Sequence, residues 1–118
     1  MPDRVLIVDD HMSFRQLARR LLEHSGYLVV GEAATAAEAV RVARNLAPDV
    51  VLLDIQLPDL DGFAVAISLR ELPSPPAVVL ISSRDSADYG PRVQECGAMA
   101  FIAKADLTVD SFRAALNR

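Results

Sequence analysis

Five short apolar runs alternate along the chain with segments whose apolar residues recur at helical spacing. Short apolar runs that end at turn or polar residues are typical of strands buried on both faces. The first run is largely β-branched and ends abruptly at two acids. The strands predicted in this way cover residues 5–8, 28–30, 50–53, 77–81 and 100–103.

The segments between these runs carry the start and stop signals of helices. Ser13 with Gln16, and Thr35 with Glu38, have the spacing of capping boxes. Gly26 and Pro48 are expected to end the first two helices. The first helix should bury one stripe of apolar residues, namely Phe14, Leu17, Leu21 and Leu22.

The later helices are predicted from weaker signals. Asp59 and Asp61 are expected to shape the loop before the third helix and to cap that helix, which should run to about Leu72. The fourth helix contains Gly90-Pro91, and proline inside a helix removes a donor and clashes with the preceding turn. We therefore expect the fourth helix to start at about Pro91 and to be short. Thr108 or a neighbour should cap the last helix.

Alternation of buried strands with helices predicts a parallel sheet with helices on both faces. Four of the five predicted strands end in polar residues that could carry chemistry. Ligands of open α/β sheets bind outside the carboxyl ends of the strands, so these residues should gather at one edge. They are Asp9, Asp10, Asp54, Ser82 and Lys104.

Composition narrows the class of protein. The 118 residues fit one domain, 1–118, and the 52% apolar content excludes a disordered chain. The net charge of −4 argues against direct binding of nucleic acid. Cys96 is the only cysteine and is expected to be buried, and no apolar run reaches membrane-spanning length. Without a leader-like N-terminus, a reducing, cytoplasmic location is expected.

The polar groups at the predicted edge suggest phosphoryl chemistry. Three carboxylates gathered together repel one another unless a cation joins them, and oxygen ligands suit Mg²⁺. Lys104, the only lysine of the chain, would complete a site of balanced charge that attracts a phosphoryl group. Asp54 is the natural nucleophile because its strand should be central, and Ser82 could donate to a phosphoryl oxygen.

Four strings resemble the receiver domain of two-component response regulators: VLIVDDH, DVVLLDIQLPDLDGF, VVLISS and FIAKADL. The resemblance covers nearly the whole chain and implies the flavodoxin-like (βα)5 fold with a doubly wound five-stranded sheet of order 2-1-3-4-5. The strings DDHMSFRQLARRLLE and KADLT are most similar to the subfamily with a C-terminal LuxR-type helix-turn-helix. DNA would then be contacted only through a C-terminal domain missing from this chain, which we expect to be excised from a longer protein.

The resemblance also implies how the site would work. Asp54 would accept a phosphoryl group from a sensor histidine kinase. Mg²⁺ would be bound by Asp10, Asp54 and the backbone carbonyl of Gln56, with Asp9 acting through a metal-bound water. These roles come from the family and not from the spacing of the residues.

The family further implies a switch and its partners. Lys104 would pair with the phosphate, Ser82 would turn towards it, and Phe101 would swing inward to fill the space. Phosphorylation would switch the face formed by the fourth helix, the fifth strand and the fifth helix. This face would control the output, which is expected to be transcription, and could form a homodimer. Such a module phosphorylates itself and is not an enzyme with an external substrate.

Some features depart from the family or leave other functions open. Ala105 follows Lys104 where many receivers carry a cis-proline. His11 is expected to be a loop or helix-entry residue and not a metal ligand, because Mg²⁺ prefers oxygen. A receiver-like interaction module that works without phosphorylation is one alternative. An aspartyl-nucleophile phosphatase would need a second acid at Gln56, and a flavin-binding domain would need a Ser/Thr-rich loop after the first strand.

Overall fold

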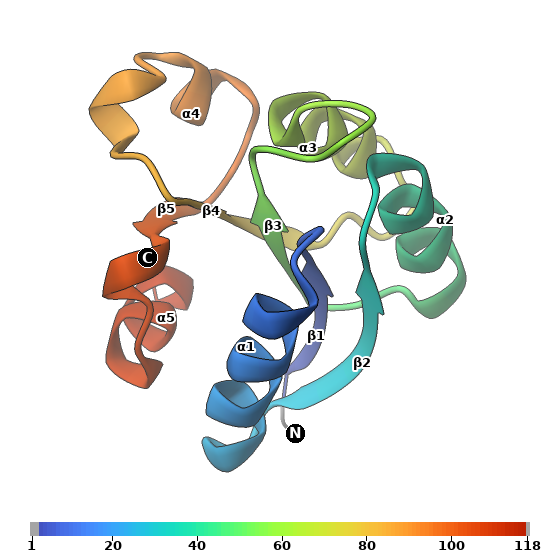
Figure 1. The fold of residues 1–118 in the computed structure, drawn as a ribbon. Coiled ribbons are helices and arrows are strands. Elements are labelled where there is room, and N and C mark those ends of the chain that lie inside the picture. Colours follow the sequence, from blue (N-terminus) through green and yellow to red (C-terminus); the bar gives the residue numbers. More distant parts are fainter. Residues whose placement is uncertain (1–2, 118) are drawn as a thin grey trace.

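The computed structural model describes residues 3–117, which form five strands and five helices in strict alternation (Figure 1). Met1, Pro2 and Arg118 lie outside the described residues, so the expectation about the N-terminal leader is not addressed there. The strands are β1 (Arg4–Val8), β2 (Leu28–Ala33), β3 (Val50–Asp54), β4 (Ala77–Ser82) and β5 (Ala100–Ala103). The α-helices are α1 (Met12–His24), α2 (Ala36–Leu46), α3 (Gly62–Arg70), α4 (Arg92–Glu95) and α5 (Val109–Leu116).

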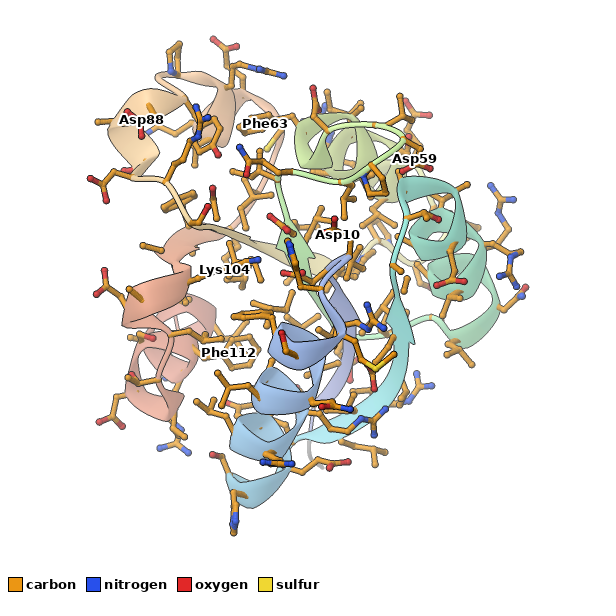
Figure 2. The ribbon with its side chains drawn as sticks, in the orientation of Figure 1. Asp10, Asp59, Phe63, Asp88, Lys104 and Phe112 are labelled. Carbon is orange, nitrogen blue, oxygen red and sulfur yellow. The ribbon has the colours of Figure 1, made fainter. Side chains whose placement is uncertain are left out.

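The strands form one parallel sheet of order β2-β1-β3-β4-β5, which confirms the predicted flavodoxin-like architecture. Helices α1 and α5 cover one face, and α2, α3 and α4 cover the other (Figure 1). Each face has its own core, because the central strands are apolar on both sides. In Figure 2, Phe112 points from α5 into the layer between α5 and α1, where it is fully buried.

The pairing register places the polar strand ends at one level. Val8 lies opposite Leu53, and Asp54 lies opposite Ile81, one residue before Ser82. Ser82 in turn pairs with Ala103, one residue before Lys104. The predicted gathering of these residues at the carboxyl edge therefore follows from the register of the sheet.

Two expectations for α1 are wrong. The helix begins at Met12 with His11 as its N-cap, and no side chain caps it, so Ser13 and Gln16 do not form a capping box. Instead, the Asp9 carboxylate accepts the His11 amide at 2.8 Å. Leu17 is 59% exposed, and Ala18 takes its place in the core together with Leu22.

The caps of α2 and α3 differ in part from the prediction. Thr35 caps α2 as expected by accepting the Glu38 amide, but the Glu38 carboxylate accepts the amide of Ala34 and closes no reciprocal box. Asp61 caps α3 by accepting the Ala64 amide. Asp59 does not cap α3: its carboxylate accepts the amides of the first two residues of α2, which hold its pKa below the usual range.

The fourth helix confirms the effect of Gly90-Pro91. Gly90 has a left-handed backbone with φ of +61°, Pro91 is the N-cap, and only four residues of α-helix follow. A single 3₁₀ turn, Ser86–Asp88, precedes it. Thr108 caps α5 in a reciprocal box with Ser111, and Cys96 is buried as expected. Among residues 3–117, no helix has the length and apolar character needed to cross a membrane.

Candidate functional site

The carboxyl ends of β1, β3 and β5 bring three charged side chains into contact. Asp9 is fully buried and Asp54 is 3% exposed. The Lys104 ammonium nitrogen lies 2.6 Å from Asp9 Oδ2 and 3.3 Å from Asp54 Oδ2. Figure 2 shows Lys104 and Asp10 at this edge of the sheet. One lysine thus bridges two buried acids that lie 45 residues apart in the sequence.

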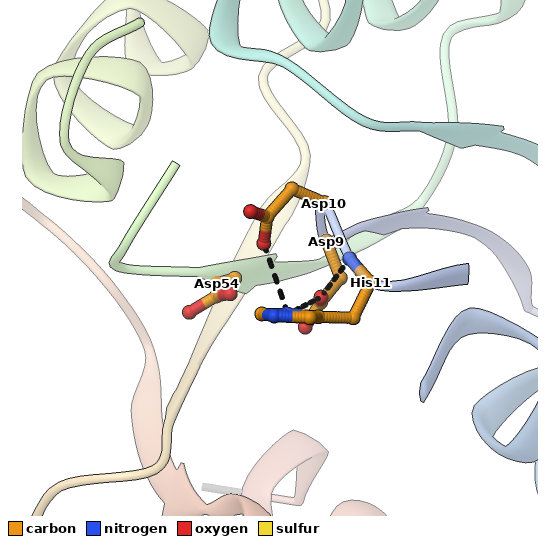
Figure 3. Close-up of side chains that lie close together, drawn as sticks. All are labelled: Asp9, Asp10, His11 and Asp54. Carbon is orange, nitrogen blue, oxygen red and sulfur yellow. Dashed lines mark hydrogen bonds and ion pairs between the residues drawn. The ribbon is translucent and has the colours of Figure 1, made fainter. Parts of the chain in front are cut away.

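Asp10 and His11 complete the acidic cluster (Figure 3). The His11 ring nitrogen Nδ1 lies 3.2 Å from Asp9 Oδ1 and 3.1 Å from Asp10 Oδ1, although the ring itself is 66% exposed. One ligand atom from each of Asp9, Asp10, His11 and Asp54 lies within 4.8 Å of the others. The cluster therefore combines two buried carboxylates with two groups that solvent can reach.

Burial dominates the electrostatics of Asp54. Burial is the largest influence and, together with the neighbouring Asp9 charge, raises the pKa of Asp54 to about 6. The Gln56 amide, which donates to Asp54 Oδ1 at 3.1 Å, and Lys104 both lower that pKa but do not cancel the burial. At neutral pH the side chain is still mainly a carboxylate, but one that is poorly solvated.

Lys104 is held as a cation. Burial lowers its pKa, but its contacts with Asp9 and Asp54 outweigh that effect and leave the pKa above the usual value. The ammonium also lies 4.6 Å from the centre of the Phe14 ring, which is within the range of a cation–π contact. Lys104 can therefore serve as a fixed positive charge for an incoming anion.

The cluster fits a divalent cation. Three carboxylates against one ammonium leave an excess of two negative charges when His11 is neutral. Asp9 Oδ2 is buried and, beyond its ion-pair contact with Lys104, receives no hydrogen bond of good geometry from the described residues. Hard oxygen donors with spare acceptor capacity are the ligands that Mg²⁺ prefers.

Some of the predicted residues lie at the site without the expected contacts. Gln56 reaches Asp54 through its backbone amide. The Ser82 hydroxyl is buried and bonds to the Tyr89 phenol and the Arg84 amide, while Phe101 is partly buried beside the Tyr89 ring. The roles of Ser82, Phe101 and the Gln56 carbonyl in a switch stay predictions.

Sequence reasoning missed several residues that build the site. A Cβ on Gly62 would lie 2.5 Å from the Asp54 carbonyl oxygen, so only glycine lets α3 approach the end of β3 this closely. Arg15 donates to the Asp9 carbonyl at 2.7 Å. A glycine in the first turn of a helix was a usable signal for Gly62, since glycine is a poor helix former. No local pattern pointed to Tyr89.

Comparisons with known proteins identify the family of this chain. A family model described as the response regulator receiver domain matches residues 5–117. A protein of Pseudomonas aeruginosa that is named as a transcriptional regulator is 41% identical over 103 residues, which are 87% of this chain and 50% of that protein. This chain thus spans about half the length of that relative.

Solved structures share the fold over nearly the whole chain. A LuxR-family two-component response regulator from Aurantimonas sp. SI85-9A1 has a TM-score of 0.87 and 31% identity, covering 98% of this chain and 86% of that one. A complex of CheX and CheY with BeF₃ and Mg²⁺ from Borrelia burgdorferi has a TM-score of 0.87 and 27% identity, covering 98% and 87%.

Proposed function

The chain belongs to the family of response regulator receiver domains, and on that premise we propose that it is a phosphorylation-dependent switch whose phosphoacceptor is Asp54. The observation that carries the proposal is the convergence of Asp9, Asp54 and Lys104 at the carboxyl edge of the sheet. Asp10 lies in the same cluster. Receiver domains of transcriptional regulators are not classical enzymes, and the proposed transfer modifies the domain itself.

The proposed reaction is a direct phosphoryl transfer. A carboxylate oxygen of Asp54 forms a bond to phosphorus while the P–N bond of a kinase phosphohistidine breaks, and its electron pair returns to the imidazole nitrogen. Asp54 needs no separate base because it is ionised at neutral pH. Lys104 lies against Asp54 and neutralises negative charge on the transferred group.

Receiver domains bind Mg²⁺ at an acidic pocket, and the donor set here suits that ion. We propose Asp10, Asp54 and the Gln56 carbonyl as its direct ligands and Asp9 as a ligand through water. Bound Mg²⁺ would supply charge neutralisation for the phosphoryl oxygens. The related CheX–CheY complex with BeF₃ and Mg²⁺ supports this pairing of an anion with that metal in the family.

The partners follow from the same premise. We propose a sensor histidine kinase as donor and transcription as the output, because relatives are named as transcriptional regulators. DNA would be contacted by another part of a longer, cytoplasmic protein, since the chain spans half of such a relative. A homodimer through the face of α4, β5 and α5 is the proposed route from phosphorylation to output.

Mass spectrometry after incubation with acetyl phosphate and Mg²⁺ tests the phosphoacceptor. We expect a gain of one phosphoryl group that a chelator prevents and that Asp54→Asn abolishes. Asp88→Asn is the matched control, because Asp88 is an exposed acid in the turn Ser86–Asp88, away from the cluster (Figure 2). Absence of any gain with several donors would favour an interaction module that works without phosphorylation, for which the short α4 leaves room.

Sedimentation velocity of the same samples tests the homodimer separately. We expect the phosphorylated domain to sediment faster than the unmodified one at equal concentration. An unchanged profile despite complete phosphorylation would contradict the dimer and leave the phosphoacceptor proposal intact.

A further inference from the structure

The hydroxyl of Ser82 is held by a tyrosine outside the acidic cluster. Ser82 Oγ lies 2.6 Å from the phenolic oxygen of Tyr89. The same Oγ accepts the backbone amide of Arg84 at 3.1 Å. Because Ser82 is fully buried, its hydroxyl has little access to hydrogen bonds with water, and these two contacts determine its position.

Tyr89 itself is held between two aromatic rings from different elements. Its ring centre is 5.5 Å from that of Phe63 in α3 and 6.2 Å from that of Phe101 in β5. Both arrangements are edge-on or tilted, as aromatic pairs prefer. One tyrosine therefore contacts the residue expected to turn towards a phosphate and the aromatic ring expected to swing inward.

The segment that carries Tyr89 is largely exposed, because residues 83–88 all lie at the surface. Open surface pockets of about 500 Å³ and about 420 Å³ lie beside it, and both are lined by Ser86, Ala87 and Phe101. The segment ends in Gly90 and Pro91, which limit regular helix to four residues. The Tyr89 phenol and the Arg84 amide thus both join this segment to Ser82 at the end of β4.

We propose that Tyr89 is a positioning residue that holds Ser82 in the unphosphorylated arrangement and competes with the phosphoryl group for its hydroxyl. This inference rests on the proposed phosphorylation of Asp54, whose strand partner Ile81 directly precedes Ser82. In this proposal, the Ser82 hydroxyl turns to donate to a phosphoryl oxygen when Asp54 is phosphorylated, and it gives up its contact with the phenol. Release of the phenol then frees the Tyr89 ring to move from between Phe63 and Phe101.

The competition makes a prediction that a purely structural role does not. Tyr89→Phe removes the phenolic oxygen and keeps the ring, so it lowers stability slightly but favours the state that binds the anion. We expect it to raise the affinity for BeF₃⁻ in the presence of Mg²⁺ by about fivefold, the change that corresponds to one hydrogen bond of ordinary net strength. A merely structural tyrosine would lower stability and affinity together.

Titration of BeF₃⁻ by NMR, at saturating Mg²⁺, measures this effect in four variants. They are wild type, Tyr89→Phe, Ser82→Ala and the double variant. In the Ser82→Ala background, Tyr89→Phe should change the affinity by less than about 1.5-fold, because the hydroxyl for which the two groups compete is absent. Tyr27→Phe is the matched control: this second tyrosine packs on Phe112 on the opposite face of the sheet and should have no effect.

Failure of this inference is distinguishable from failure of the proposed function. Equal or lower affinity of Tyr89→Phe, or an effect that persists without Ser82, would overturn the role of Tyr89 while BeF₃⁻ binding still supports the receiver. If wild type binds no BeF₃⁻, the proposed function fails. Urea unfolding of the four variants then decides whether the contact exists, since additive effects of the two substitutions would overturn it.

Discussion

The side chains around Asp54 bury more negative than positive charge. Asp54 and Asp9 are both buried carboxylates, and a single ammonium, that of Lys104, touches both. Burying a charge costs free energy unless it is paired, and one cation cannot fully compensate two anions. The raised pKa of Asp54 expresses this cost. Without a divalent ion, the buried charges therefore lower the stability of the fold. Binding of a cation at the site would offset this cost.

Asp54→Asn should stabilise the domain when no divalent ion is present. The pKa of Asp54 is about 6 in the folded chain and near 3.8 in the unfolded one. Between pH 3.8 and pH 6, the folded chain therefore keeps a proton on Asp54 that the unfolded chain has lost. The contribution of Asp54 to the stability of the fold is therefore most favourable below pH 3.8 and is lost as the pH rises through 6. Above pH 7, Asn removes this cost, and we expect a gain of about 2 kcal/mol in the free energy of unfolding.

Urea unfolding in a chelating buffer at pH 5 and at pH 7.5 gives the measurement. The advantage of Asp54→Asn should be larger at pH 7.5, whereas the exposed control Asp88→Asn should show no such dependence. A wild type that is at least as stable as Asp54→Asn at pH 7.5 would contradict the described burial of the charge.

At the scale of elements, the junction between β3 and α3 sets the position of Asp54. The Gly62 amide donates to the Ile55 carbonyl at 2.7 Å, and Asp61 caps the helix that Gly62 begins. These bonds draw the first turn of α3 against the backbone of the strand end. The absence of a side chain at Gly62 is what permits the approach.

Gly62→Ala should damage both stability and the site. Its Cβ would lie 2.5 Å from the Asp54 carbonyl oxygen and 2.7 Å from the Ile55 Cα, and backbone atoms cannot yield as a flexible side chain can. We expect a loss of about 2 kcal/mol of stability and a phosphorylation rate at least ten times lower. Thermal unfolding and timed labelling with acetyl phosphate measure the two effects.

Gly26→Ala is the control for that substitution. Gly26 has a φ of +89° and open space around it, so alanine there strains the backbone by about 1 kcal/mol without touching the site. Its labelling rate should equal that of wild type. A normal labelling rate in Gly62→Ala would show that the close approach does not position Asp54.

At the scale of the whole molecule, the site exists only because the sheet is complete. Asp9 directly follows β1, Asp54 is the last residue of β3 and Lys104 directly follows β5, and the parallel register brings them to one edge. Both layers of helices pack on those strands. Binding of a cation at this edge is therefore linked to the folding of the entire domain.

Mg²⁺ should accordingly stabilise the domain by mass action. At ten times its own measured Kd, the ion should add about 1.4 kcal/mol to the free energy of unfolding and raise Tm by about 5 °C. Differential scanning calorimetry over a Mg²⁺ series measures the shift. Asp10→Asn should lose most of the response and Asp88→Asn none, and an equal response in both would place the ion elsewhere.

Local patterns in the sequence predicted most of the fold. Apolar runs and turn residues predicted the five strands, their parallel order followed from the alternation with helices and the family resemblance, and Gly90-Pro91 predicted the short α4. The gathering of Asp9, Asp10, Asp54 and Lys104 was also predictable, because strand ends in a parallel sheet share an edge. These features depend on periodicity and backbone geometry, which are local.

Features that depend on contacts between distant segments emerged only in the folded chain. Asp59 has the chemistry of a cap, but its place beside α2 and not α3 results from how the loop folds over. The bond from Tyr89 to Ser82, the ring of Phe14 beneath Lys104 and the close approach at Gly62 likewise join different elements. The chain's order of residues determined which groups reach the edge of the sheet, whereas side-chain packing decided which of them touch, because that packing is settled only when every element is in place.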